Sequence, residues 1–217
     1  MDFNWNLIIK WWPKIIQATG VSLEIFIASS ICAVVVGILI ATMVTAGKPW
    51  IAVPCNVYIS VFRNSPLLVV LLFLFFGLPS IGIRMSSFAA GILGITLNES
   101  AFMAEIIRGN ILAVRKGDWE AAESLGLSKM QVLRYAILPQ AIRDSLPAIT
   151  GQLSIVLKDT SILSLIMIVE LTRIANTIYT RTFDLSGFMV AALIYISLFF
   201  VLNSISTIVE NKIRVRR

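Results

Sequence analysis

Polar and charged residues interrupt two long apolar stretches of this 217-residue chain. Asn98 and Glu99 are neighbours in the first stretch, and Asp159, Thr160 and Ser161 are consecutive in the second. A carboxylate beside a carboxamide can accept hydrogen bonds from an ammonium or guanidinium group and can orient a zwitterion. The two hydroxyls can also bond to the backbone where a helix unwinds. These residue types favour recognition of a small ligand with a positive group.

The charged residues also have structural alternatives. Glu99 can pair with Lys158 and hold two helices together. Glu105 and Arg108 are spaced by three and can form an ordinary pair on a helix surface, or a pair at an inner gate. Arg63, followed by Asn64, Ser65 and Pro66, can mark a helix kink and a cytoplasmic anchor. The sequence leaves these roles open.

Composition excludes several other kinds of site. The chain has no histidine, two cysteines and no CxxC pair, so we predict no metal site. It lacks a GxxxxGK[ST] phosphate loop, so we expect no ATP hydrolysis by this chain. The net charge of +6 does not indicate nucleic acid, because the basic residues collect beside apolar segments and no basic stripe with interleaved aromatic residues is visible.

The segments that carry the polar residues are predicted to span a membrane. The chain is 58% hydrophobic and 14% charged, whereas a soluble domain carries roughly 25% charged residues. A spanning helix needs about 20 residues. We predict five such helices, at residues 19–46, 54–78, 86–107, 142–171 and 186–209. Asn98 and Glu99 then fall about 18 Å from the start of the third span and about 14 Å from Arg108, near mid-membrane.

The basic residues predict how the chain is oriented. The connection at 108–143 and the C-terminal tail, which ends in Arg216 and Arg217, carry more lysine and arginine than the opposite side. This asymmetry places both in the cytoplasm and the N-terminus outside. Residues 1–18 mix tryptophan, lysine and aliphatic residues, which is typical of a segment at the lipid headgroups or of a plain juxtamembrane tail. We predict one transmembrane domain, residues 1–217.

Residues 109–138 are predicted to form a charged cytoplasmic hairpin of two helices. Asp118 can cap a helix that starts at Trp119. Gly126 can end this helix in a left-handed conformation. The run Ser128-Lys-Met-Gln131 indicates a capping box that opens the next helix.

The first helix of this hairpin is too short to be stable alone. Glu120 is expected in its first turn, and Ala121, Ala122 and Leu125 on one face. Because two turns of helix need a docking partner, this face must pack either on the chain's own membrane domain or in a groove of another protein.

The hairpin resembles the EAA loop of ABC-importer permeases, Glu-Ala-Ala-x-x-x-Gly followed at a fixed distance by Ile-x-Leu-Pro. The matching residues are Glu120, Ala121, Ala122, Gly126, Leu138 and Pro139, while Ala136 departs from the isoleucine common in the family. Val61–Leu68, Asn98–Gly109 and Leu157–Ser161 are similar to segments of the polar amino-acid uptake subfamily. The resemblance implies an all-α membrane fold of the type I ABC-importer permeases, with five spans.

The same resemblance implies a function. Permeases of this subfamily import polar amino acids across the bacterial cytoplasmic membrane as dimers, with ATP and Mg²⁺ bound by separate ATPase subunits and an extracellular or periplasmic solute-binding protein. Coupling would rest on Glu120, Ala121, Ala122, Glu123, Leu125 and Gly126. Substrate contact would rest on Asn98, Glu99, Phe102, Asp159, Thr160 and Ser161. The chain itself would hold no catalytic residue, metal or cofactor and bind no nucleic acid.

Three alternatives stay open. The same machine could carry methionine, an osmolyte or an oxyanion, although Glu99 favours a ligand with a positive group over phosphate. A secondary transporter could use Glu99 and Asp159 as proton carriers. A membrane scaffold could use the hairpin to recruit a cytosolic protein, but it would have no reason to bury Asn98 and Glu99 at mid-membrane.

Overall fold

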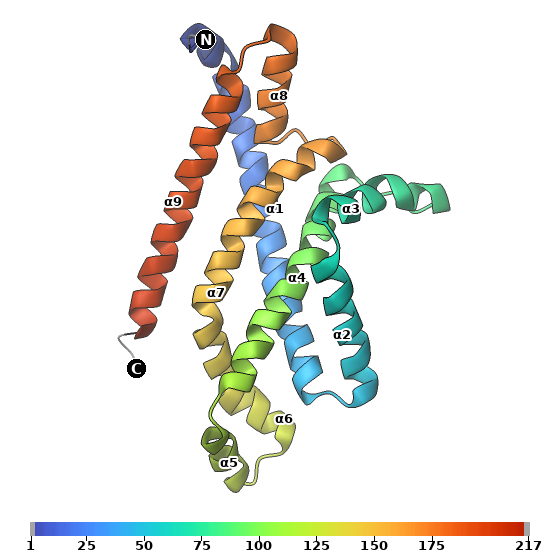
Figure 1. Cartoon of the computed structure of the whole chain (residues 1–217), viewed down its shortest axis with the longest axis vertical. Coiled ribbons are helices and arrows are strands. Elements are labelled where there is room, and N and C mark those ends of the chain that lie inside the picture. Colours follow the sequence, from blue (N-terminus) through green and yellow to red (C-terminus); the bar gives the residue numbers. More distant parts are fainter. Residues whose placement is uncertain (1–2, 215–217) are drawn as a thin grey trace. The chain divides into compact units, whose positions relative to one another are not determined.

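The computed structural model describes residues 3–214 of the chain, and these form helices without a strand. The predicted all-α fold is therefore confirmed for this part. The α-helices are α1 (Trp5–Ala46), α2 (Pro49–Asn64), α3 (Leu67–Leu72), α4 (Ser87–Ala113), α5 (Lys116–Ser124), α6 (Lys129–Val132), α7 (Leu138–Asp159), α8 (Leu171–Thr182) and α9 (Ser186–Arg214) (Figure 1). Two π-helical turns, Phe73–Gly77 and Leu133–Ile137, and two 3-10 segments, Leu78–Ile81 and Thr160–Ile166, complete the order. Arg216 and Arg217 of the predicted basic tail lie outside the described residues.

Four helical segments are long and apolar enough to cross a membrane, and the interrupted pair of α2 with residues 67–81 would make a fifth. The first begins at Trp5 rather than at residue 19, because α1 continues through Pro13. Its 42 residues extend about 63 Å at 1.5 Å per residue, well beyond a hydrocarbon core of about 30 Å. The N-terminal stretch is therefore the first part of α1 rather than a separate element.

The second predicted span, residues 54–78, is not one helix. α2 ends at Asn64, and Ser65 takes an extended conformation with φ −90° and ψ 131°. Pro66 follows, and a proline disfavours helical geometry in the residue before it. α3 then begins at Leu67 and passes into the π-helical turn. The second predicted span is therefore interrupted rather than continuous, and the helix kink considered at Arg63 to Pro66 is confirmed.

The described chain divides into two compact units. Unit one comprises Met1–Ser30, Leu67–Ile95 and Leu153–Ser204, and unit two comprises Ile31–Pro66, Thr96–Gln152 and Ile205–Arg217. α1 and α9 each contribute to both units.

Unit one has its core around α8, a helix that the sequence did not predict. The fourth span was expected to run to residue 171, but α7 ends at Asp159 and a 3-10 segment ends at Ile166. α8 buries a stripe spaced three or four residues apart, Leu171, Ile174, Ala175 and Ile178. This stripe packs with Ile8, Ile15 and Ala18 of α1 and with Val190 and Ala191 of α9 (Figure 1).

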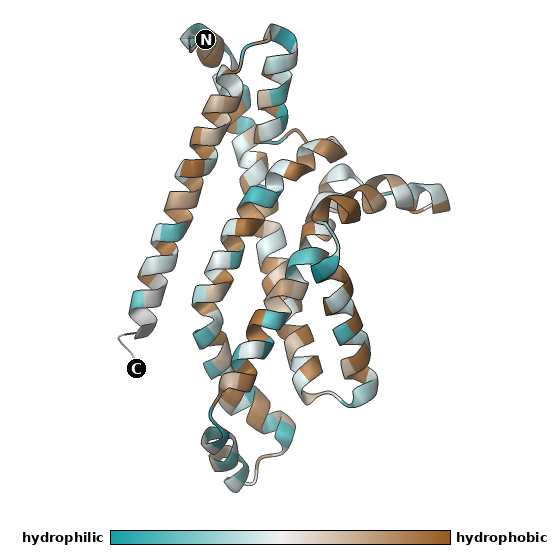
Figure 2. Ribbon diagram, viewed as in Figure 1, coloured by the Kyte–Doolittle hydropathy of each residue, from teal (hydrophilic) through white to brown (hydrophobic). Residues whose placement is uncertain are grey.

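Unit two is built on the second half of α4. Met103, Ala104, Ile107 and Ile111 on this helix are fully buried. Gly37 of α1 lies against α4 so closely that a Cβ atom there would come within 2.5 Å of the Met103 Cβ. α4 leads into the α5–α6 hairpin, whose polar colouring contrasts with the hydrophobic colouring along much of α9 in Figure 2.

Candidate functional site

Asn98 is 5% exposed and ties α4 to the end of α2. Its side-chain amide donates to the carbonyl oxygens of Phe62, at 2.8 Å, and Ser65, at 3.2 Å. Pro66 has no N–H, so the carbonyl of Phe62, four residues earlier, loses its helical donor. Asn98 supplies the missing hydrogen bond. Since both donors of the amide serve the backbone, the side-chain oxygen is the atom suited to a ligand.

Glu99 is 1% exposed, next to Asn98 in α4. Gln152 of α7 donates from Nε2 to Oε2 of Glu99 at 2.8 Å. Within unit two this carboxylate is thus met by a side-chain amide, and the alternative pairing with Lys158 of unit one stays a prediction. An ionised carboxylate in the hydrocarbon region is costly unless polar or cationic groups meet it. The arrangement suits a carboxylate that receives a cationic group of a ligand.

Residues of α4 on either side of Asn98 and Glu99 also contact polar side chains of α2. The hydroxyl of Tyr58 in α2 lies 2.9 Å from the Leu97 carbonyl and 2.7 Å from the Ser100 hydroxyl. Phe102 is half-buried, and the guanidinium carbon of Arg63 lies 5.5 Å from its ring centroid. This distance permits a cation–π contact. Arg63 is thereby directed at the predicted site residue Phe102.

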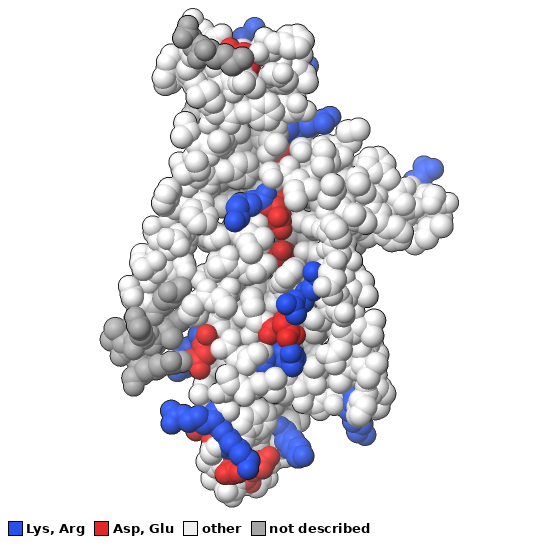
Figure 3. Space-filling model, viewed as in Figure 1, with Lys and Arg blue, Asp and Glu red and all other residues white. Residues whose placement is uncertain are grey.

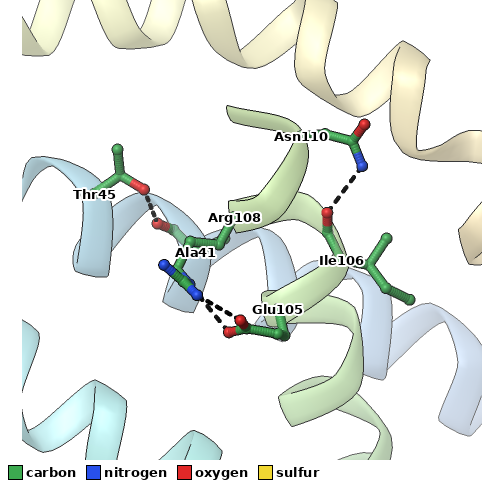
Figure 4. Close-up of polar contacts among 6 residues, drawn as sticks. All are labelled: Ala41, Thr45, Glu105, Ile106, Arg108 and Asn110. Atoms are coloured by element: carbon green, nitrogen blue, oxygen red, sulfur yellow. Dashed lines mark hydrogen bonds and ion pairs between the residues drawn. The ribbon is translucent and has the colours of Figure 1, made fainter. Parts of the chain in front are cut away.

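Glu105 and Arg108 form the ordinary helix pair that their spacing allows. Arg108 Nε lies 3.0 Å from Glu105 Oε2, and a second contact joins Nη2 to Oε1 (Figure 4). Both side chains are about one-third exposed. Figure 4 shows Thr45 of the neighbouring α1 bonded to Ala41 of its own helix. A role at an inner gate stays a prediction.

Asp159, Thr160 and Ser161 lie in unit one, where α7 gives way to the 3-10 segment. The buried Thr160 hydroxyl donates to the Leu157 carbonyl at 2.7 Å. The expectation that a hydroxyl would bond to the backbone at a change of helix is confirmed for Thr160. Asp159 and Ser161 are half-buried.

Glu170 is a fully buried carboxylate at a position that the sequence predicted to lie inside the fourth span. It caps α8 by accepting hydrogen bonds from the backbone N–H groups of Thr172, at 2.8 Å, and Arg173, at 2.6 Å. The Tyr195 hydroxyl donates to it at 3.0 Å. Burial raises the pKa of Glu170 above its ordinary value, and these hydrogen bonds oppose the rise. The signal that could have revealed this cap is the apolar stripe that begins at the next residue.

The α5–α6 hairpin differs from its prediction at the first helix. α5 begins at Lys116 with Arg115 at the N-cap, so Asp118 lies in the first turn and does not cap the helix. Glu120 is consequently one turn further on, where it pairs with Lys116 at 3.2 Å. Lys116 and Gly117 are thus part of the helix, two residues ahead of Asp118.

Other features of the hairpin are confirmed. Gly126 has φ +78°, the left-handed conformation that glycine adopts without strain. Gln131 accepts from the Ser128 N–H at 2.9 Å in the predicted capping box that opens α6. The predicted face is not packed as a whole on this chain, because Ala122 is buried while Ala121 is exposed and Leu125 is 80% exposed.

The outer surface of the hairpin is accessible and mixed in charge. Lysine, arginine and acidic side chains gather on it in Figure 3. Its exposed residues include Glu120, Ala121, Glu123, Leu125 and Gly126. A single exposed leucine is common on protein surfaces, so contact of this surface with another protein stays a prediction.

A polar interior within apolar helices, joined to a water-exposed hairpin, defines the membrane component of a transport system. A family model described as binding-protein-dependent transport system inner membrane component matches residues 33–215. The chain therefore belongs to this family. It is a multi-pass protein of the bacterial inner membrane and not an enzyme, since ATP hydrolysis resides in a separate subunit of such systems.

Individual relatives match almost the whole chain. A probable amino-acid ABC transporter permease protein of Bacillus subtilis, YckA, is 38% identical over 211 residues, which cover 97% of this chain and 93% of the relative. The glutamine transport system permease protein GlnP of Escherichia coli is 34% identical over 219 residues, covering 99% and 100%. The crystal structure of an amino acid ABC transporter with histidines superposes with a TM-score of 0.90 at 33% identity, covering 98% and 100%.

Proposed function

We propose that this chain is the permease subunit of an ATP-driven importer of polar amino acids. The relatives named as amino-acid and glutamine permeases support this cargo class. The observation that carries the proposal is Glu99, a carboxylate 1% exposed in an apolar helix and held by the side chain of Gln152. A carboxylate there favours a ligand with an ammonium or guanidinium group and disfavours phosphate.

The substrate contacts follow from the chemistry of each residue. Glu99 receives the positive group, and the side-chain oxygen of Asn98 accepts a further hydrogen bond, because the amide donors of Asn98 already serve α2. Phe102 offers an apolar face. Asp159, Thr160 and Ser161 of unit one are proposed as further polar contacts, as the sequence predicts.

Partner proteins supply the energy for transport by hydrolysing ATP. Two ATPase subunits, which bind ATP and Mg²⁺, contact the hairpin at Glu120, Ala121, Glu123, Leu125 and Gly126, and Ala122 supports this contact from inside the hairpin. The 80% exposure of Leu125 and the exposed Glu120 and Glu123 support such a contact. Ala122 is buried within the hairpin, so its role is to let α5 pack closely rather than to touch the ATPase.

A second permease chain, identical or related, completes the pathway, because five helices alone enclose little space. The N-terminus is outside and the hairpin and C-terminus are cytoplasmic, as the distribution of lysine and arginine predicts. A solute-binding protein delivers the amino acid on the outer face. ATP-driven closure of the ATPase subunits then moves the hairpins and switches the permeases between outward- and inward-facing states.

The test is reconstitution of the permease with its ATPase subunits and binding protein in proteoliposomes. Each amino acid, with methionine and an osmolyte such as glycine betaine for comparison, is assayed for stimulation of ATP hydrolysis and for uptake. We expect one or a few polar amino acids to stimulate both. Stimulation by methionine or the osmolyte alone would overturn the cargo class.

The energy source separates this proposal from a secondary transporter. With ATP maintained inside the vesicles, a protonophore is expected to leave uptake unchanged. Uptake that collapses with the proton gradient and continues without ATP would contradict an ATP-driven importer.

A further inference from the structure

A basic cavity lies in unit one between the first turns of α1 and the end of α8. Its volume is about 520 Å³, and Lys14 and Gln17 of α1 and Arg181 of α8 line it together with Trp11. A smaller cavity of about 320 Å³ shares Trp11, Lys14 and Arg181 and adds Lys10. None of these residues has a part in the proposed transport mechanism.

Trp11 brings the cations together. The Lys14 ammonium lies 4.8 Å from the Trp11 ring centroid, and the Arg181 guanidinium carbon lies 5.6 Å from it. Both distances permit cation–π contacts. The Trp11 ring thus lies near one positive side chain from α1 and one from α8, two helices that are far apart in sequence.

The gathered charges are not neutralised by the side chains that the structure describes. Among these side chains, no carboxylate forms an ion pair with Lys10, Lys14 or Arg181. Lys10 and Lys14 are four residues apart on one helix, a spacing at which like charges repel. The next acidic residue along α1, Glu24, is about 15 Å beyond Lys14. An anion that entered the cavity would relieve this repulsion.

The cavity changes from basic to apolar along α1. Ala18 and Val21 line it on the side towards the apolar part of the helix, and Val169 adds to this wall. Val21 follows Lys14 by seven residues, or about 10 Å along the helix axis. A ligand that fits both ends has an anionic head and an apolar tail.

We propose that this cavity binds the phosphate group of an anionic phospholipid. Lys14 and Arg181 hold the phosphate oxygens, since guanidinium and ammonium groups form charge-assisted hydrogen bonds with phosphate. Gln17 donates to the head group, and the acyl chains lie along Val21 and Val169. Tryptophan and lysine at this end of α1 are typical of the headgroup region. The lipid site is independent of the amino-acid site.

The test measures lipid binding to the full-length chain copurified with its ATPase subunits. Native mass spectrometry after titration with phosphatidylglycerol is compared for wild type, the double variant Lys14→Gln with Arg181→Gln, and a control pair, Lys48→Gln with Arg84→Gln. The control removes the same charge from exposed positions outside the cavity. We expect the cavity variant to weaken binding about tenfold or more, and the control to bind as wild type does.

Three further arms make the result decisive. Diacylglycerol with the same acyl chains lacks the phosphate and is expected to bind weakly to every variant. The charge-retaining pair Lys14→Arg with Arg181→Lys is expected to keep binding, which guards against a folding defect in the glutamine variant. Inorganic phosphate is expected not to displace the lipid. Equal binding by the cavity and control variants, or full displacement by phosphate, would overturn the lipid assignment; a cavity variant that binds lipid normally but loses the solute-binding protein would indicate a protein contact instead.

Discussion

Glu99 in unit two and Glu170 in unit one are both buried carboxylates, but their partners differ in kind. Glu170 accepts from two backbone N–H groups of the next turn of the chain and from the Tyr195 hydroxyl. Glu99 accepts from Gln152, a side chain on another helix. Backbone donors at a helix cap are fixed when the helix forms, whereas a side-chain amide can rotate away.

The difference fits a structural role for Glu170 and the substrate-binding role that we propose for Glu99. Glu170 stabilises α8, because its removal leaves two part-buried backbone donors of the first turn without their acceptor. Glu99 keeps a carboxylate in a place where a ligand's positive charge can replace or join an amide donor. Burial alone therefore does not identify a binding residue, and the proposed role of Glu99 rests on its depth and charge together with a donor that belongs to a side chain.

The largest effect on stability is expected from Glu170→Ala. The change removes the cap of α8 and leaves the buried Tyr195 hydroxyl without its acceptor, which together cost about 3 kcal/mol. Thermal unfolding of the purified complex, followed by tryptophan fluorescence, checks this. Glu24→Ala, the same change at an exposed position of α1, serves as the control. An unchanged unfolding temperature for Glu170→Ala would mean that this carboxylate is not structural.

Glu99→Gln is expected to spare stability and impair transport. The amide keeps the shape of the side chain but loses the charge, and a hydrogen bond to a charged group is worth about 2 kcal/mol, or about thirtyfold in substrate affinity. The readouts are uptake and substrate-stimulated ATP hydrolysis in proteoliposomes, with the unfolding temperature measured alongside. Uptake and stimulation equal to wild type in a well-assembled complex would sink the proposed role of Glu99.

Asn98 should behave like Glu170 despite its place beside Glu99. Asn98→Leu removes the donors to the Phe62 and Ser65 carbonyls and is expected to destabilise the complex by about 1.5 kcal/mol. Combining this change with Pro66→Ala sharpens the comparison. Alanine at position 66 has a backbone N–H that can donate to the Phe62 carbonyl, so part of the lost free energy of unfolding should return. If Pro66→Ala returns none of it, the backbone gap at residue 66 does not explain the position of Asn98.

The smallest effect is a slope of stability with pH. Burial raises the pKa of Glu170 above its ordinary value, so the folded chain binds this proton more readily than the unfolded chain. The stability contributed by Glu170 is then complete below the unfolded pKa and declines as pH rises through the folded pKa. Glu170→Gln should flatten this decline, as unfolding temperatures across the range would reveal. A slope that is unchanged in Glu170→Gln would contradict this assignment.

The sequence predicted the fold class and most of the helices because apolar length is a strong signal in a membrane chain. The sequence analysis misplaced helix boundaries that are set by single residues rather than by average hydropathy. A helix break at Ser65 depends on the single proline after it, and hydropathy averages over that proline. α8 escaped notice because its apolar stripe occupies one face of a helix too short and too polar to span a membrane.

The sequence predicted which residues form the candidate site but not their hydrogen-bond partners. Charge within an apolar segment identified Glu99, yet nothing in the sequence around it points to Gln152, 53 residues later. The amide donors of Asn98 could not be assigned because their acceptors exist only where α2 ends. In the hairpin, Gly126 and the Ser128–Gln131 box act on near neighbours, and both were predicted correctly.

The π-helical turn at Leu133–Ile137 joins the hairpin to α7 with a wider winding than an α-helix has. Each residue added to or removed from an α-helix rotates the adjoining part of the chain by about 100°. Deleting one residue from this turn would convert it to an ordinary α-helical turn. The hairpin would then rotate about the α7 axis, and the exposed side of α5 would face another direction. A genetic change of one codon here could alter which way the hairpin faces while leaving every residue of the hairpin itself intact.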